Sequence, residues 1–186
     1  MAKHKHDDAC LEVVARSHVA YELHQMAQMS KPAFLGEHAR LAGVALLEAY
    51  LIHVRNLDEF LTLRRGKCRW PELVVADHYF DDAWNPPTCL DRADLNHISR
   101  KIAHIYCDRE DGFDWSAEGV LPRFAQRVLH VFEHDFLASL RELHPACAAW
   151  FDDGVANAHA ALAAADAGII FARVVLGPLG EPEPLI

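Results

Sequence analysis

Apolar residues recur through most of this chain at spacings of three and four, and almost no stretch alternates as a half-buried strand does. Asp7 and Asp8 can cap and charge the start of a first helix, which runs to about Ser30. The spacing predicts that the apolar side of this helix carries Leu11, Val14, His18, Tyr21 and Met29.

A second long helix is predicted over residues 41–63, and it is apolar nearly all round. Such a helix is expected to be buried, yet it carries a polar cluster made of Glu48, His53, Arg55, Asn56 and Glu59. Polar groups that leave water without partners cost free energy, so these side chains must find hydrogen-bonding groups. Gly66 stands where a glycine could close the helix.

Residues 67–90 read as an extended connection with Pro71, Pro86 and Pro87 as breakers and a short helical turn near residues 73–80. A loop of this length is usually functional or packed by its own aromatic residues. The residues that can supply this packing are Tyr79, Phe80 and Trp84.

A third helix is predicted from Asp91 to about residue 108, with an apolar ridge of Leu95, Ile98, Ile102 and Ile105. A fourth begins near Pro122, which suits a first helical turn, and ends at His144 before Pro145. Its predicted interior residues are Phe124, Val128, Val131, Phe132, Phe136, Leu140 and Leu143.

The chain beyond the fourth helix is Ala-rich over residues 146–168 and is predicted to be helical, with an interruption near Asp153 and Gly154. Residues 169–176 form an apolar run that suits a short strand or a packing arm, and residues 177–186 predict a disordered tail. The sequence therefore predicts an all-α fold, a single-domain helical bundle of four to five helices over residues 1–176, with a long loop between the second and third helices.

The composition narrows the class of function. Lys and Arg total 18 against 27 Asp and Glu, and the formal charge of -9 disfavours a broad, sequence-independent grip on nucleic acid. The five cysteines form no CxxC pair, which indicates reduced thiols. The N-terminus has no signal-peptide pattern, and no apolar run approaches the roughly 18 residues that cross a bilayer. We therefore expect a cytoplasmic protein that does not contact a membrane.

His130, Glu133 and His134 match the H-x-x-E-H pattern, in which two histidines bind zinc and the glutamate is a general base. Arg123 and Arg127 extend the same face, so a charged, solvated face is the simpler interpretation. A catalytic zinc also needs a third protein ligand, and the glutamates that follow are Glu142, Glu181 and Glu183. We expect no cofactor and no metal, and keep a metal-binding bundle as an alternative.

Arginine and histidine also occur at the R-x4–6-H spacing of helical domains that cleave nucleic acid. The matches are Arg92 to His97, Arg123 to His130, and Arg127 to His134, but chance alone predicts about 2.7 of them. The grouping of such residues along the chain distinguishes a candidate site from chance matches better than the spacing does. The third helix has the densest mixture of cations, imidazole and amide, and its members are Asn96, Arg100, Lys101, His104 and Arg109.

The segments LLEAYLIHVRNLDEFL and NHISRKIAHIYCDRE, joined by a loop that contains Asp and Trp, are similar to HEPN-type helical bundles of toxin–antitoxin and abortive-infection systems. The resemblance covers roughly residues 40–140. It implies a dimeric helical bundle in which an Arg and a His at the dimer cleft cleave RNA without a metal. This chain departs from the pattern, because three residues separate Arg100 from His104 instead of four to six.

The resemblance leads to the hypothesis of a HEPN-like homodimer that acts on or binds RNA in a stress or defence setting, in which ribonuclease activity is metal-independent. His104 would be the acid or base. Phosphate would be held by Arg55, Arg100 and Arg109, and the orienting amides would be Asn56 and Asn96.

Two other hypotheses remain open. In one, the chain is a non-enzymatic interaction module or structural bundle, and the polar cluster of the second helix bridges that helix to its neighbours; the net acidity favours this hypothesis. In the other, the histidines make a metal-binding bundle.

Overall fold

The computed structural model describes residues 6–30, 40–68, 70, 72–81, 84–103 and 120–163, and only the backbone of residues 40–46, 100–103 and 120. Every regular element within these residues is helical, which confirms the predicted all-α fold. The described helices form five rods, some of them made of helical segments that follow one another directly, and the bundle of four to five helices is thereby confirmed. The predicted arm at residues 169–176 and the tail at residues 177–186 lie outside the described part.

The first rod runs through α1 (Asp8–Val13), the π-helical segment η1 (Val14–Val19) and α2 (Ala20–Met29). It begins as predicted, because the carboxylate of Asp7 caps it by accepting the amide of Cys10 at 2.8 Å. The predicted apolar side is wrong in part: His18 is exposed and Tyr21 is 55% exposed. The buried ridge instead has a spacing of four and consists of Leu11, Ala15, Val19, Leu23 and Ala27. A π turn takes up more residues than the 3.6 of an α turn, so this spacing stays on one face.

The helix predicted over residues 41–63 is α3 (Arg40–Thr62). Gly66 does not close it, contrary to the prediction, because α3 ends at Thr62 and Gly66 lies within the short 3-10 helix η3 (Arg65–Lys67). Just beyond the helix, the amide of Arg65 donates to the buried carboxylate of Asp77 at 3.0 Å. A side chain distant in sequence therefore holds the chain where it leaves α3.

The long loop between the second and third helices is confirmed and spans residues 63–91. It contains η3 and a second 3-10 helix, η4 (Ala76–Tyr79), near the predicted turn. Tyr79 and Phe80 are buried and Trp84 is half-buried, so the loop is packed by its own aromatic residues as expected. The third helix, α4 (Arg92–Ala103), starts where Asp91 accepts the amide of Asp94 at 2.8 Å.

The fourth rod joins α5 (Val120–Val131), the π-helical η5 (Phe132–Leu137) and α6 (Ala138–Leu143). Its buried ridge again has a spacing of four, at Val128, Phe132, Phe136 and Leu140. Leu143 was predicted to face the interior but is 61% exposed, because it is the last residue of α6 and lies off this ridge. His144 breaks the helix, and Pro145 opens the next one, α7 (Pro145–Ala148).

The last described rod continues from α7 through η6 (Ala149–Phe151) into α8 (Asp152–Ala163). The predicted interruption at Asp153 and Gly154 is wrong, since α8 runs through both residues. Gly154 is instead buried against the first rod. A Cβ atom added to it would lie 2.9 Å from the Cβ atom of Ala20 and 3.0 Å from its Cα atom. The glycine therefore allows α8 and α2 to pack closely.

Gly154→Ala is expected to lower the free energy of unfolding by about 1 kcal/mol or more, as measured by urea denaturation. Alanine raises helix propensity by about 1 kcal/mol, but the backbone of Ala20 cannot move aside cheaply. Gly66→Ala is the matched control, because a Cβ atom added to Gly66 would meet no other atom within 4 Å. A Gly154→Ala protein as stable as that control would contradict close packing at this point.

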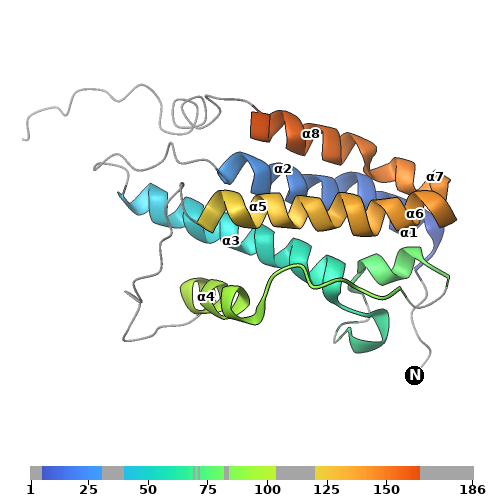
Figure 1. Ribbon diagram of the computed structural model, residues 1–186, viewed down its shortest axis with the longest axis horizontal. Helices are drawn as coiled ribbons and strands as arrows, with labels where there is room; N and C mark the ends of the chain where they lie inside the picture. The colour runs from blue at the N-terminus through green and yellow to red at the C-terminus, as the bar shows by residue number, and fades with distance from the viewer. Residues whose placement is uncertain are drawn as a thin grey trace, which may run out of the picture.

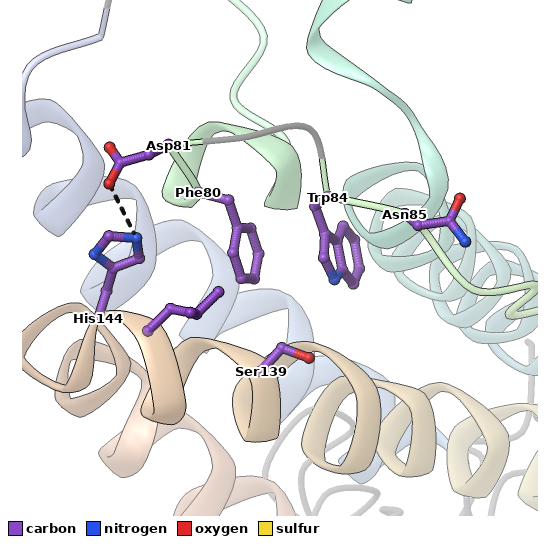
Figure 2. A pocket seen from close by; sticks show the side chains of 7 residues that line it. Phe80, Asp81, Trp84, Asn85, Ser139 and His144 are labelled. Carbon is purple, nitrogen blue, oxygen red and sulfur yellow. Dashed lines mark ion pairs between the residues drawn. The ribbon is translucent and has the colours of Figure 1, made fainter.

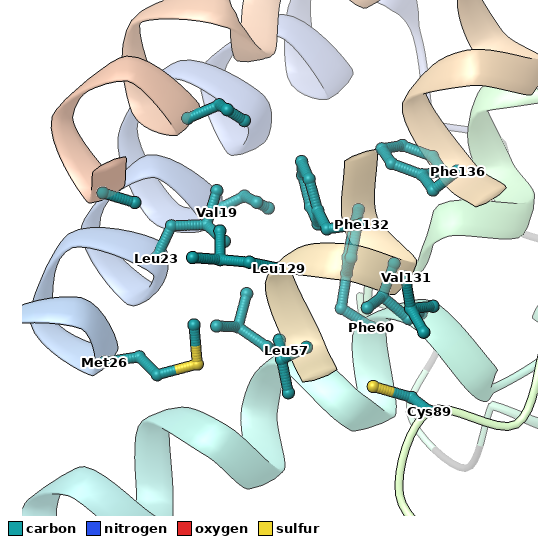
Figure 3. Close-up of a cluster of buried hydrophobic side chains, with 14 of the residues drawn as sticks. Val19, Leu23, Met26, Leu57, Phe60, Cys89, Leu129, Val131, Phe132 and Phe136 are labelled. Atoms are coloured by element: carbon teal, nitrogen blue, oxygen red, sulfur yellow. The ribbon is translucent and has the colours of Figure 1, made fainter. Parts of the chain in front are cut away.

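The described side chains form a buried hydrophobic cluster to which all five rods and the long loop contribute; α4 supplies Ile98. Figure 1 shows α2, α3, α5 and α8 running side by side, with α4 below α3. Figure 3 shows the centre of the cluster, where Met26 and Leu23 from α2 meet Leu57 from α3 and Leu129 from α5. In the part that the structure describes, no helix combines the length and hydropathy needed to span a bilayer.

Candidate functional site

The polar cluster of α3 is met by a glutamate on the first rod. One carboxylate oxygen of Glu22 lies 2.7 Å from Nδ1 of His53, and the other accepts the side-chain amide of Asn56 at 3.2 Å. The side chains of His53 and Glu22 are only 11% and 23% exposed. Three polar groups therefore satisfy one another between α2 and α3, which is how polar residues are accommodated on an otherwise apolar helix.

Arg55 pairs within its own helix. Its guanidinium group donates two hydrogen bonds to Glu59 Oε1, at 3.0 and 3.1 Å, and both side chains are nearly half exposed. Glu59 and Glu22 line a groove of about 300 Å³ with Asn56 and His18. Carboxylates thus occupy the places beside Arg55 and Asn56 where phosphate oxygens would have to sit, which makes the groove unfavourable for an anion.

Glu22→Ala is expected to lower the free energy of unfolding by about 1–3 kcal/mol, because it leaves the buried His53 without its partner, whereas the exposed Asn56 can bond to water. Glu59→Ala serves as the control. It removes only a surface pair one helical turn apart, which is worth about 0.3–0.5 kcal/mol. Thermal or urea unfolding measures the stability of both variants. Equal losses of stability in Glu22→Ala and Glu59→Ala would show that the contacts of Glu22 with His53 and Asn56 do not stabilise the fold.

The remaining predicted site residues belong to α4 or follow it. Asn96 is exposed on α4, and Arg100 lies on the same helix, where the structure describes only its backbone. His104 and Arg109 lie outside the described residues. The proposed convergence of Arg55 with His104 therefore stays a prediction.

The described face of α4 is tied to α5 by charge. Asp94 is almost buried, and Oδ1 of its carboxylate accepts Arg123 Nη2 at 3.1 Å. Burial and the neighbouring Asp91 raise the pKa of Asp94, while Arg123 and Arg127 act in the opposite direction. These contacts position α4 against the fourth rod.

A pocket of about 420 Å³ lies between the long loop and α6 (Figure 2). The loop supplies Phe80, Asp81, Trp84 and Asn85, and the end of the fourth rod supplies Ser139, Leu143 and His144. The rings of Phe80 and Trp84 are stacked with 5.5 Å between their centroids and 7° between their planes. The pocket therefore has an aromatic wall with polar groups at its ends.

The two ends of this pocket differ in charge. At one end, Oδ2 of Asp81 lies 3.5 Å from Nε2 of His144, and the Asp81 side chain is 92% exposed. At the other end, Asn85 Oδ1 accepts Arg64 Nη2 at 2.9 Å. Figure 2 shows the Ser139 hydroxyl turned away from His144, so these residues do not form a nucleophilic Ser-His-Asp arrangement.

The pocket wall is held by Asp77, a buried carboxylate in η4. Its two oxygens accept the backbone amides of Arg65 and Trp84, each at 3.0 Å. The Arg65 guanidinium group in turn donates to the carbonyls of Phe80 and Asp81 at 3.2 and 3.1 Å. The loop is therefore fixed by polar contacts on one side and aromatic packing on the other.

A second buried carboxylate fixes the end of the loop. Asp58 of α3 accepts the amide of Leu90 at 3.0 Å. Burial raises the pKa of Asp58, and the hydrogen bond from Leu90 opposes that rise. Burial also raises the pKa of the neighbouring Cys89 thiol, which is therefore kept in its unreactive, protonated form.

The pocket residues were not identified from the sequence as a site. Phe80 and Trp84 were expected only as loop packing, and the polar residues carry no motif. Because the loop and α6 are about 60 residues apart in the chain, only the tertiary fold brings them together. The cluster of aromatic residues in a long Pro-rich loop was the available signal.

Comparison of the chain with protein-family models, curated proteins and solved structures gave no match. The similarity to HEPN-type bundles therefore rests on the sequence segments alone.

Proposed function

We propose that this chain is a non-enzymatic interaction module that binds a basic segment of a partner protein at the pocket between the long loop and α6. The observation that carries the proposal is the pairing of an aromatic wall with an almost fully exposed carboxylate, Asp81. A Lys or Arg side chain matches both features, because its apolar stem can lie on the rings while its cation reaches the carboxylate.

The net charge of the chain also favours a basic segment as the ligand of this pocket. The chain carries a formal charge of -9, which attracts basic partners over a distance set by the salt concentration. Two arginines lie beside the pocket, and both are engaged: Arg64 donates to Asn85 at the end away from Asp81, and Arg65 is paired with Asp77 and donates to the carbonyls of Phe80 and Asp81. The exposed Leu143 extends the rim with an apolar contact for residues that flank the cation.

The contacts of α3 favour an interaction module over the RNA-binding hypothesis. Arg55 and Asn56 were expected to hold and orient phosphate, and both are bonded to carboxylates. RNA binding in a homodimer stays a prediction that depends on His104. If the purified chain cleaved RNA and His104→Ala abolished that cleavage while helical content was retained, the RNA hypothesis would replace the one proposed.

The probe for the proposal is a tetra-arginine peptide, with tetra-glutamate as its charge-reversed counterpart. The indole N–H signal of Trp84, assigned by its loss in Trp84→Phe, is followed by NMR during titration. We expect tetra-arginine to shift this signal and tetra-glutamate to leave it in place. Asp81→Asn is expected to weaken binding by about fivefold, as for an exposed ion pair of good geometry.

Asp153→Asn is the matched control, because it removes an exposed carboxylate on α8 with the same change of net charge. It should bind tetra-arginine as the unaltered chain does. The proposal fails if tetra-arginine leaves the Trp84 signal unmoved, or if the two Asp→Asn variants weaken binding equally.

A further inference from the structure

Two histidines lie one helical turn apart on the outer side of the fourth rod. His130 belongs to α5 and His134 to η5, and both are exposed. Their ring centroids are 4.5 Å apart and their planes are inclined at 46°. In helical metal-binding motifs, two histidines at positions i and i+4 on one face of a helix coordinate zinc. We propose that His130 and His134 form a surface site for Zn²⁺ that is separate from the pocket at Phe80 and Trp84.

The residue between them on this face adds a fixed negative charge. Glu133 Oε1 lies 2.8 Å from His159 Nε2, so α8 holds the carboxylate in place beside the histidine pair. Glu133 is partly buried, with 26% of its side chain exposed, which weakens its screening by solvent. A carboxylate held near a metal site favours the bound cation and orients the ligands around it.

One positive charge of the same rod is engaged away from the histidine pair. Arg123 donates to Asp94 of α4 at 3.1 Å and lies over the ring of Phe124. Its guanidinium group is therefore held towards α4.

The backbone supports the histidine pair with an uncommon local structure. His134 and Glu133 both belong to η5, a π-helical segment of six residues that begins between the two histidines. Such segments are rare and recur at functional sites. Here the π turn keeps the core ridge in phase while His130 and His134 stay adjacent on the outer face.

The chemistry of this site differs from that of a zinc hydrolase. No group of three His, Cys, Asp or Glu side chains that could hold a metal ion occurs among the described residues. The protein would therefore supply two imidazole ligands, and water would complete the four-coordinate zinc. Neutral imidazole also suits Cu²⁺ and Ni²⁺, so these ions would compete for the same pair.

Titration of the full-length chain with ZnCl₂, in competition with a chromogenic chelator, tests the site. We expect His130→Ala and His134→Ala each to lose the same one equivalent of Zn²⁺, or to lower its affinity by at least about tenfold, because loss even of outer partners costs 10–100-fold. Glu133→Gln should lower the affinity for the same Zn²⁺ equivalent by a smaller factor. Both histidines are exposed, so circular dichroism should show unchanged helix content.

His18→Ala is the control for nonspecific loss of an exposed imidazole, since His18 lies on the first rod. It should retain the zinc equivalent that the His130 and His134 variants lose. The site is disproved if the unaltered chain binds no Zn²⁺, or if His130→Ala and His134→Ala bind it as tightly as His18→Ala does.

Discussion

Replacing Phe136 by alanine is expected to lower the free energy of unfolding by about 3–5 kcal/mol, the largest loss for any single residue of this core. Phe136 is fully buried in η5, at the point where the fourth rod meets the long loop and η6. Its ring lies within 5.1–6.1 Å, between centroids, of six other aromatic rings: Phe60, Tyr79, Phe80, Trp84, Phe132 and Phe151. Removing it leaves a cavity that no single neighbour can fill.

Urea denaturation measures this loss, and two variants bracket it. Phe136→Leu keeps most of the side-chain volume, so it should lower the free energy of unfolding by less than Phe136→Ala does. Val13→Ala removes an exposed apolar side chain and should change stability by no more than about 0.5 kcal/mol. If Phe136→Ala were as stable as Val13→Ala, the aromatic cluster could not be the centre of the core.

Asp77→Ala is expected to be the most damaging polar substitution, with a loss of about 2–6 kcal/mol. It leaves the partly buried amides of Arg65 and Trp84 without an acceptor, and each unpaired group costs up to about 1–3 kcal/mol. It also removes the carboxylate that lies 3.7 Å from Nε of Arg65. Because Arg65 holds the carbonyls of Phe80 and Asp81, the wall of the pocket should loosen with it.

Hydrogen exchange at the two amides, together with urea denaturation, separates loop opening from global unfolding. Asp77→Asn retains one acceptor oxygen, so its stability and its amide protection should lie between those of the original chain and those of Asp77→Ala. Asp81→Ala, at an exposed carboxylate four residues away, should be nearly neutral for stability. Unchanged protection of the Arg65 and Trp84 amides in Asp77→Ala would refute the role assigned to this carboxylate.

The sequence was sufficient for the fold class and for most helix ends, because these depend on local patterning and capping. Asp7 and Asp91 cap their helices as their positions suggested. The end of α3 was predicted within one residue, but the contacts that follow it were not. Arg65, just beyond the helix, donates to Asp77, which lies 12 residues further along and reaches it only in the folded chain.

The site could be predicted only in part. The polar residues of α3 were expected to need partners, and His53 and Asn56 do reach another rod. The identity of the partner, Glu22, follows from the packing of α2 on α3, which the sequence does not specify. The pocket at Phe80 and Trp84 could not be predicted for the same reason, because no sequence periodicity relates a loop to the end of a distant helix.

The two π-helical segments also bear on redesign of this bundle. Each lies inside a rod whose buried residues are spaced by four: Leu11, Ala15, Val19 and Leu23 in one, and Val128, Phe132, Phe136 and Leu140 in the other. An idealised backbone made only of α turns would carry this pattern gradually around the helix and out of the core. A designer who straightens either rod must therefore delete a residue within the wide turn or rewrite the apolar positions that follow it.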